Sequence, residues 1–194
     1  MQKEKLQKII ELINWGDSYF KEKGIPESRL NIELMLCHIL KCKRMNLYLN
    51  FDKPLIQTEL EILRDFIKRR LNREPLQYIL GITEFMGLPF ELNSSVLIPR
   101  QETEILVETV IKYSTKLLCD PVKILDIGTG SGNIAISLAK NIKNCSVTAI
   151  DIDEKALGLA NHNAVLNGVA DKINFCQLDI LNTRLSDEQY DIIV

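Results

Sequence analysis

The chain has 194 residues, of which 46% are hydrophobic and 26% charged, a composition typical of globular proteins with one medium domain or two small ones. Its net charge of −2 gives no basic excess for binding nucleic acid over the whole surface. No apolar run is long enough to span a bilayer, and the charged start of the chain is unlike a secretory signal, so we expect a cytoplasmic protein.

Residues 1–74 have the pattern of a small helical domain. Apolar residues recur there every three or four positions, which indicates helices with one buried face. Thr58 and Glu61 resemble a capping box at the start of the last of these helices. We expect the helices at 3–22, 29–41, 45–49 and 58–72.

Residues 75–98 are expected to form a linker that contains a β-hairpin. Gly87 and Pro89 interrupt an extended run over 85–92, as the turn of a hairpin does, and 96–98 is a further short extended piece.

From residue 99 to residue 194 strands alternate with helices. Such alternation predicts a parallel sheet with helices on its faces. Asp153 has the position of an N-cap before one of the helices. We expect helices at 102–118, 133–142 and 154–166, and strands at 123–127, 145–150, 173–178 and 190–194.

The run from Asp126 to Gly132, Asp-Ile-Gly-Thr-Gly-Ser-Gly, is the most informative segment of the chain. It joins a buried strand to a helix, where glycines let backbone approach a ligand and the helix start offers free N–H groups. A dinucleotide fingerprint would need its third glycine at Asn133, so the spacing disfavours that cofactor. Asp126 suits a ligand with a cationic end, such as the amino group of S-adenosylmethionine. Asp151 ends the next strand about 20 residues later, where a carboxylate accepts ribose hydroxyls.

The cysteines and histidines predict no metal site. The five cysteines are odd in number and include no C-x-x-C pair, so neither a disulfide framework nor a zinc site is indicated. Cys37, His38 and Cys42 stand close together, but three such residues on one helix make a poor tetrahedral site. His162 has no obvious partner in the sequence.

Three further stretches, taken with the glycine run, resemble the HemK/PrmC family of release factor glutamine-N5 methyltransferases. They are Pro-Leu-Gln-Tyr-Ile-Leu-Gly at 75–81, Glu-Phe-Met-Gly at 84–87 and Ile-Pro-Arg-Gln-Glu-Thr-Glu at 98–104. The resemblance covers essentially the whole chain. It implies a class I methyltransferase domain of the Rossmann-like α/β type at 99–194, preceded by the helical domain and the hairpin linker. It also implies S-adenosylmethionine as the cofactor and peptide chain release factors as the protein substrate, recruited by residues 1–74.

The resemblance also assigns roles to individual positions. The glycine run would wrap the methionine part of S-adenosylmethionine and Asp151 would hold the ribose, while Asp179 with Ile180 would contact the adenine. The loop beside the glutamine pocket would contain Pro99, Arg100, Glu102, Thr103 and Glu104, with Gln101 where the family usually has proline. The expected cofactor-binding residues are Asp126, Gly128, Thr129, Gly130, Ser131, Gly132, Asp151, Asp179 and Ile180.

The family continues after a segment such as Tyr190–Val194 with an Asn-Pro-Pro-Tyr motif and further strands. We therefore expect the sequence to be an N-terminal fragment with a truncated sheet, whose catalytic residues lie after Val194.

Three other functions stay open. A nucleic-acid amino-methyltransferase would need a basic surface, and the one basic cluster is Lys68, Arg69, Arg70 and Arg73, which is typical of a solvated helix face. An NAD-dependent oxidoreductase is disfavoured by the glycine spacing and by Asp126. A non-catalytic adaptor would use the helical domain as its interaction module.

Overall fold

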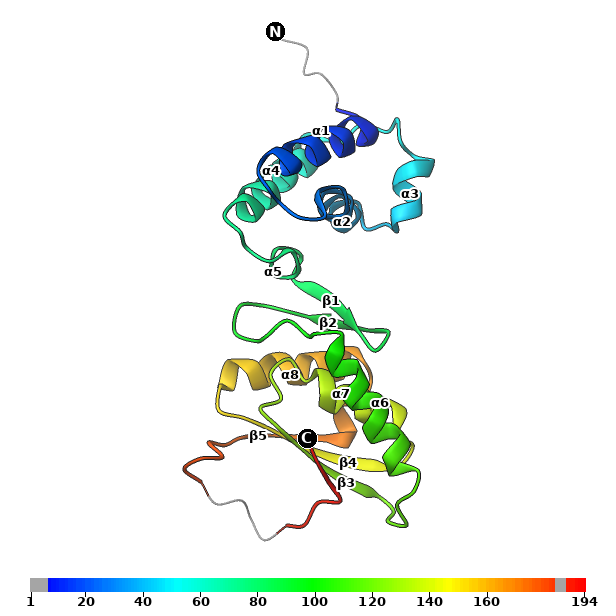
Figure 1. Ribbon diagram of the computed structural model, residues 1–194, viewed down its shortest axis with the longest axis vertical. Helices are drawn as coiled ribbons and strands as arrows, with labels where there is room; N and C mark the ends of the chain where they lie inside the picture. Colours follow the sequence, from blue (N-terminus) through cyan, green and yellow to red (C-terminus); the bar gives the residue numbers. More distant parts are fainter. Residues whose placement is uncertain (1–6, 184–187) are drawn as a thin grey trace. The chain divides into compact units, whose positions relative to one another are not determined.

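The computed structural model describes residues 7–183 and 188–194, and the chain divides into two compact units, Met1–Leu80 and Gly81–Val194 (Figure 1). The expected linker 75–98 is shared between them. Its first part is helix α5 (Leu76–Leu80), whose Ile79 lies in the core of the first unit. Its hairpin places Phe85 and Phe90 in the core of the second unit. The division at Gly81, where φ is +70°, therefore follows the two cores.

The first unit contains α1 (Ile9–Glu22), α2 (Ser28–Leu40), α3 (Arg44–Leu49), α4 (Gln57–Leu71) and α5. The expected helix 3–22 is shorter than predicted, because its N-cap is Lys8, whose N–H donates to Glu11 at 3.2 Å. Positions 3–6 of that prediction lie outside the described residues. The apolar faces of α1, α2 and α4 meet in one core, which includes Leu12, Ile13, Phe20, Ile32, Met35, Leu36, Leu63 and Phe66.

The expected capping box at Thr58 and Glu61 is wrong by two residues. The N-cap of α4 is Ile56, and its N–H donates to the Glu59 carboxylate at 2.9 Å. Glu59 sits at the third helical position, where a carboxylate satisfies an amide that the helix leaves free. The sequence offers two acidic residues in this turn, Glu59 and Glu61, and Glu59 is the one that caps the helix.

A buried carboxylate joins α2 to α3. Glu33 is fully buried, and it accepts hydrogen bonds from Arg29 at 3.0 Å, from Arg44 at 2.5 Å and from the Tyr48 hydroxyl. Burial by itself raises the pKa of Glu33, but the hydrogen bonds from Tyr48 and Arg44 outweigh it, so the pKa is lowered overall. Glu33 is thus a buried charge with its partners in place.

The second unit begins with the hairpin of β1 (Ile82–Phe85) and β2 (Leu88–Glu91), followed by α6 (Glu102–Ser114). Met86 and Gly87 form the two-residue turn, both with positive φ, as tight hairpin turns require. The expected extended piece at 96–98 forms no strand. α6 ends four residues before the predicted Leu118, whose side chain is fully exposed.

A four-stranded parallel sheet follows, with order β5-β4-β3-β6. The strands of the sheet and the helices between them are, in chain order, β3 (Val122–Ile127), α7 (Asn133–Asn141), β4 (Cys145–Asp151), α8 (Glu154–Leu166), β5 (Ile173–Gln177) and β6 (Ile192–Ile193). Figure 1 shows α6, α7 and α8 on one side of this sheet. Their apolar faces pack against Val122, Ile124, Val147 and Ala149. The class I methyltransferase arrangement predicted from the sequence is confirmed for these elements.

Candidate functional site

A cavity of about 210 Å³ lies at the carboxyl ends of β3, β4 and β5. Ligands of parallel α/β sheets bind at this edge, because the strands end there and the loops to the helices begin. The described residues that line the cavity come from these three strand ends. They are Ile127, Gly128, Ile150, Asp151, Ile152, Leu178, Asp179, Ile180 and Leu181. The structure thus brings together Gly128, Asp151, Asp179 and Ile180, which the sequence had assigned to cofactor binding.

The glycine run leaves β3 and enters α7 in a tight loop. Gly132 has φ +79°, and a Cβ built there would lie 2.9 Å from Ile136 Cδ1 and 3.1 Å from the Ala160 Cβ, so only glycine lets α7 and α8 pack this closely. Gly128 differs, because a Cβ there, at φ +75°, would meet no heavy atom within 4 Å. The backbone at Gly128 therefore faces open space beside the cavity, as a cofactor cradle requires.

Asp126 lies beneath this loop and does not line the cavity. Its side chain is 2% exposed and points to the same side of the sheet as Ile124, where it accepts a hydrogen bond from the Thr129 hydroxyl at 2.7 Å. Burial raises the pKa of Asp126 to about 6, and the hydrogen bonds from Thr129 and from the backbone of Ala135 offset only part of that rise. The Asp126 carboxyl therefore anchors the glycine loop through Thr129, and burial disfavours the negative charge that it carries next to that loop.

Asp151 holds the same loop from the neighbouring strand. Its Oδ2 accepts from the Gly130 N–H at 2.9 Å, and its Oδ1 accepts from the Asp153 N–H at 3.0 Å. A carboxylate oxygen has two lone pairs, so both oxygens of Asp151 retain acceptor capacity toward hydroxyl groups in the cavity. Asp153 caps α8 by accepting from the Lys155 N–H at 2.8 Å, as predicted.

Asp179 shapes the loop after β5. Its Oδ1 accepts from the Leu181 N–H at 3.0 Å and its Oδ2 from the Asn182 side chain at 2.7 Å. The Asn182 and Leu181 hydrogen bonds lower the pKa of Asp179. The carboxylate is therefore engaged within its own loop, and the neighbouring Ile180 and Leu181 give that side of the cavity an apolar wall.

The segment expected to border the glutamine pocket does not line this cavity, and its predicted role stays a prediction. Among the described residues that line the cavity, none comes from Pro99, Arg100, Glu102, Thr103 or Glu104. Arg100 and Glu102 are exposed, and Pro99, Thr103 and Glu104 are partly buried. Glu104 has a structural contact that the sequence did not reveal, because its Oε1 accepts from the Met86 N–H at 2.7 Å and so ties α6 to the hairpin turn.

The basic cluster at the end of α4 is not the solvated face that we expected. Arg69 pairs with Glu74 at 2.5 Å, and Arg70 donates to the Asn31 side chain at 2.7 Å. Arg73 donates to the carbonyl oxygen of Gly24 at 2.8 Å. Three of the four cationic groups are thus engaged inside the first unit, which leaves little of the cluster for phosphate contacts.

Sequence reasoning missed Asn163, a fully buried polar residue on α8. It contacts both the glycine loop, through the carbonyl of Ser131, and the end of β2, through the backbone of Glu91. A signal was present, because Asn163 and Asn167 fall on the helix face that also carries Ala156, Ala160 and Ala164. Polar residues on a buried face need hydrogen-bond partners, and here those partners are backbone groups.

The described residues contain neither a cluster suited to a metal ion nor a helix suited to cross a membrane. In that part of the chain no three His, Cys, Asp or Glu side chains are grouped so that they could hold a metal ion. No helix within the same residues combines the length and apolar character needed to cross a membrane.

Comparisons with known proteins agree with the two-unit division. Residues 11–81 match the family model described as the PrmC N-terminal domain, and residues 120–194 match one described as a methyltransferase domain. The release factor glutamine methyltransferase of Chlorobaculum tepidum is 40% identical over 96% of this chain and 65% of its own length. That of Geobacter sulfurreducens is 38% identical over 100% of this chain and 66% of its own. That of Flavobacterium psychrophilum is 49% identical over 91% of this chain and 61% of its own length. The chain spans just under two thirds of the length of these relatives.

Proposed function

Since the chain joins a PrmC N-terminal domain to a methyltransferase domain and is similar over its whole length to release factor glutamine methyltransferases, we propose that it binds S-adenosylmethionine and serves methyl transfer to a release factor. The proposed acceptor is the side-chain amide nitrogen of the glutamine in the Gly-Gly-Gln motif. We place the reaction in the cytoplasm, where release factors act.

The observation that carries the proposal is the cavity at the strand ends together with the open backbone at Gly128. About 210 Å³ is smaller than the roughly 300–1,000 Å³ of common ligand pockets, which suits the nucleoside half of the donor. Asp151 would accept the ribose hydroxyls, and Ile180 and Leu181 would pack on the base. The glycine loop, with the Asp126 charge beneath it, would surround the amino-acid half of the donor.

The donor supplies a methyl group on a positively charged sulfur, which is already activated for transfer. The acceptor amide is a weak nucleophile, because its lone pair is delocalised into the carbonyl. The protein would therefore act chiefly by alignment and by holding the amide N–H groups with acceptors. In the family those acceptors belong to the Asn-Pro-Pro-Tyr motif, which the resemblance places after Val194. The residues that line the cavity and form the glycine loop would then serve to bind the donor.

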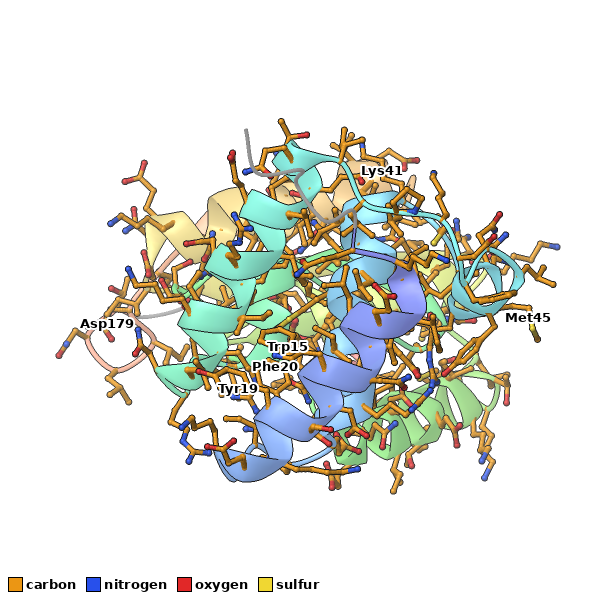
Figure 2. The ribbon with its side chains drawn as sticks, turned by 90° about the horizontal axis from the view of Figure 1, so that it is seen from above. Trp15, Tyr19, Phe20, Lys41, Met45 and Asp179 are labelled. Carbon is orange, nitrogen blue, oxygen red and sulfur yellow. The ribbon has the colours of Figure 1, made fainter. Side chains whose placement is uncertain are left out.

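The first unit would recruit the release factor. A groove of about 370 Å³ runs between α1 and α4, and its apolar lining includes Leu12, Trp15, Leu63 and Ile67. Trp15 is half exposed and stacks on Tyr19 along α1, with ring centroids 5.2 Å apart (Figure 2). Exposed aromatic side chains of this kind are frequent anchors of protein interfaces.

Two measurements test the proposal. Calorimetry with S-adenosylhomocysteine and with NADH, each added to the purified protein, should detect binding of S-adenosylhomocysteine only. Tight binding of NADH would contradict the proposed methyltransferase function. Methyl transfer from labelled donor should then be compared on a release factor, on the same factor with its Gly-Gly-Gln glutamine replaced by asparagine, and on DNA and RNA. Label on nucleic acid, or equal label on both release factors, would contradict the proposed acceptor.

A separate comparison tests recruitment. Trp15→Ala should lower methylation of an intact release factor more than methylation of a short Gly-Gly-Gln peptide, because the peptide lacks the release factor surface that would bind the groove. Tyr113→Ala, which removes an equally exposed aromatic ring from the second unit, should leave both substrates unchanged. An equal loss on protein and peptide would assign Trp15 to folding and not to recruitment.

A further inference from the structure

Asn163 uses its whole side chain to join two segments that are far apart in the sequence. Its Nδ2 donates to the carbonyl oxygen of Ser131 at 3.0 Å and to the carbonyl oxygen of Glu91 at 3.1 Å. Its Oδ1 accepts from the Glu91 N–H at 2.8 Å. The side chain is fully buried, so water does not compete for these bonds.

The Ser131 contact completes a set of side-chain bonds around the glycine loop. Asp126 holds Thr129 from β3, and Asp151 holds the Gly130 N–H from β4. Asn163 holds Ser131 from α8, the residue just before the tightly packed Gly132. Each successive loop residue is thus fixed by a side chain from a different element. A loop of glycines needs such bonds, because glycine leaves the backbone many alternative conformations.

We propose that Asn163 is a positioning residue for the amino-acid end of the methyl donor. The inference rests on the proposed function, in which the glycine loop surrounds that end of the ligand. By holding the Ser131 carbonyl, Asn163 fixes the peptide planes on either side of it in the orientation that the ligand meets. Through Glu91 it also ties the loop to the β-hairpin that precedes the 98–104 segment, so that ordering of the loop stabilises the hairpin.

Asn167 provides a matched control on the same helix. It lies one turn further along α8, is 6% exposed, and its Nδ2 donates to the carbonyl oxygens of Pro89 and Asn163, both at 2.9 Å. These two partners lie in the hairpin and in α8, and neither belongs to the glycine loop. Loss of Asn167 therefore removes an anchor of the hairpin and spares the loop.

The test compares Asn163→Ala with Asn167→Ala by calorimetry, using two ligands. S-adenosylhomocysteine has the amino-acid end, and methylthioadenosine lacks it. Asn163→Ala should weaken binding of S-adenosylhomocysteine by about tenfold, the effect of losing one or two net hydrogen bonds, and binding of methylthioadenosine by less than about threefold. Asn167→Ala should leave both affinities within about threefold of the original. Equal losses for both ligands in Asn163→Ala, or no loss, would overturn the inference, as would the same selective loss in Asn167→Ala.

A second measurement applies if Asn163→Ala does not fold. Amide hydrogen exchange of the unmutated protein should slow at Glu91 when S-adenosylhomocysteine is added, and slow less with methylthioadenosine. Equal protection by the two ligands, or none, would refute the positioning role. Failure of the proposed function is a distinct result, because the unmutated protein would then bind neither nucleoside.

Discussion

Replacing Asp126 by asparagine should stabilise the ligand-free protein at neutral pH. Asp126 is 2% exposed, and burial raises its pKa from the ordinary 3.8 to about 6. Because the folded-state pKa lies above that of the unfolded chain, protonation favours the folded state. The contribution of Asp126 to the free energy of unfolding is therefore highest below about pH 4 and falls as the pH rises toward and through 6. A rise from 3.8 to about 6 corresponds to about 3 kcal/mol at pH 7.

Asparagine has nearly the same shape and no charge, so it removes this penalty. It also introduces an NH₂ group without an acceptor and leaves fewer lone pairs for Thr129 and the backbone of Ala135, which costs about 1–2 kcal/mol. The net gain in unfolding free energy should be about 1–2 kcal/mol at pH 7 and should turn into a loss of similar size near pH 4. Urea denaturation at pH 4, 5.5 and 7 without ligand measures both values.

A stability difference between the original protein and Asp126→Asn that is the same at all three pH values would contradict this prediction. Such a result would mean that the carboxyl does not change its proton binding on folding. Thr129→Val is the matched control, because it removes the hydroxyl partner and keeps the carboxyl. That variant should be less stable than the original, but replacing its Asp126 by asparagine should still change the stability by an amount that depends on pH between 4 and 7.

Three other substitutions test separate parts of the structure. Gly132→Ala should cost about 2–4 kcal/mol of stability, because alanine is strained at this positive φ and its Cβ would overpack against α7 and α8. Gly128→Ala should cost only about 1–2 kcal/mol, because its φ is equally positive but its surroundings are open. Thermal unfolding compares the two variants, and equal costs would contradict the packing argument. Glu33→Gln should cost about 1–3 kcal/mol of stability at pH 7 and little at pH 3. A carboxyl with a lowered pKa stabilises the fold above its unfolded pKa and loses that effect as the pH falls. A stability difference that persists at pH 3 in urea titrations would argue against the ionised contact. Glu104→Ala should speed hydrogen exchange at the Met86 amide, while Glu104→Gln, which keeps an acceptor oxygen, should not; unchanged exchange in both variants would mean that the turn holds itself.

The sequence predicted β3, α7, β4, α8 and β5 to within one residue at each end, because each carries a strong local signal, whereas α6 and β6 are shorter than predicted. The helix predicted at 154–166 matches α8 at both ends, since Asp153 caps its start and Asn167-Gly168 ends it. The sequence also placed Asp151 and Asp179 at strand ends, and both line the cavity. These successes share one cause: parallel strands that precede turns of Gly and Asp leave the relevant residues at the same edge of the sheet.

What the sequence could not predict depends on contacts between distant segments. The motif at 98–104 gave no sign that the Glu104 carboxylate accepts from the Met86 amide, 18 residues earlier in the chain. The arginines at the end of α4 seemed a solvated face, yet Arg70 reaches Asn31 across 39 residues. Helical periodicity reports which face of a helix is buried, but it does not report which backbone carbonyl or amide a polar side chain will find.

Two buried carboxylates in this chain, Glu33 and Asp126, differ in their hydrogen-bond partners and in the direction of their pKa shifts. Glu33 and Asp126 are almost equally inaccessible, at 0% and 2% exposure. Two arginines and a tyrosine surround Glu33, and its pKa is lowered. Asp126 has a hydroxyl and an amide as its partners, no ion pair to it is found among the described residues, and its pKa is raised. A buried negative charge that lacks a cation lowers the stability of a fold, and a carboxyl with a strongly perturbed pKa beside a cavity is a candidate functional group. In the proposed function the Asp126 charge acts on the amino group of the methyl donor through the glycine loop, so Asp126→Asn should gain stability and lose affinity for S-adenosylhomocysteine together.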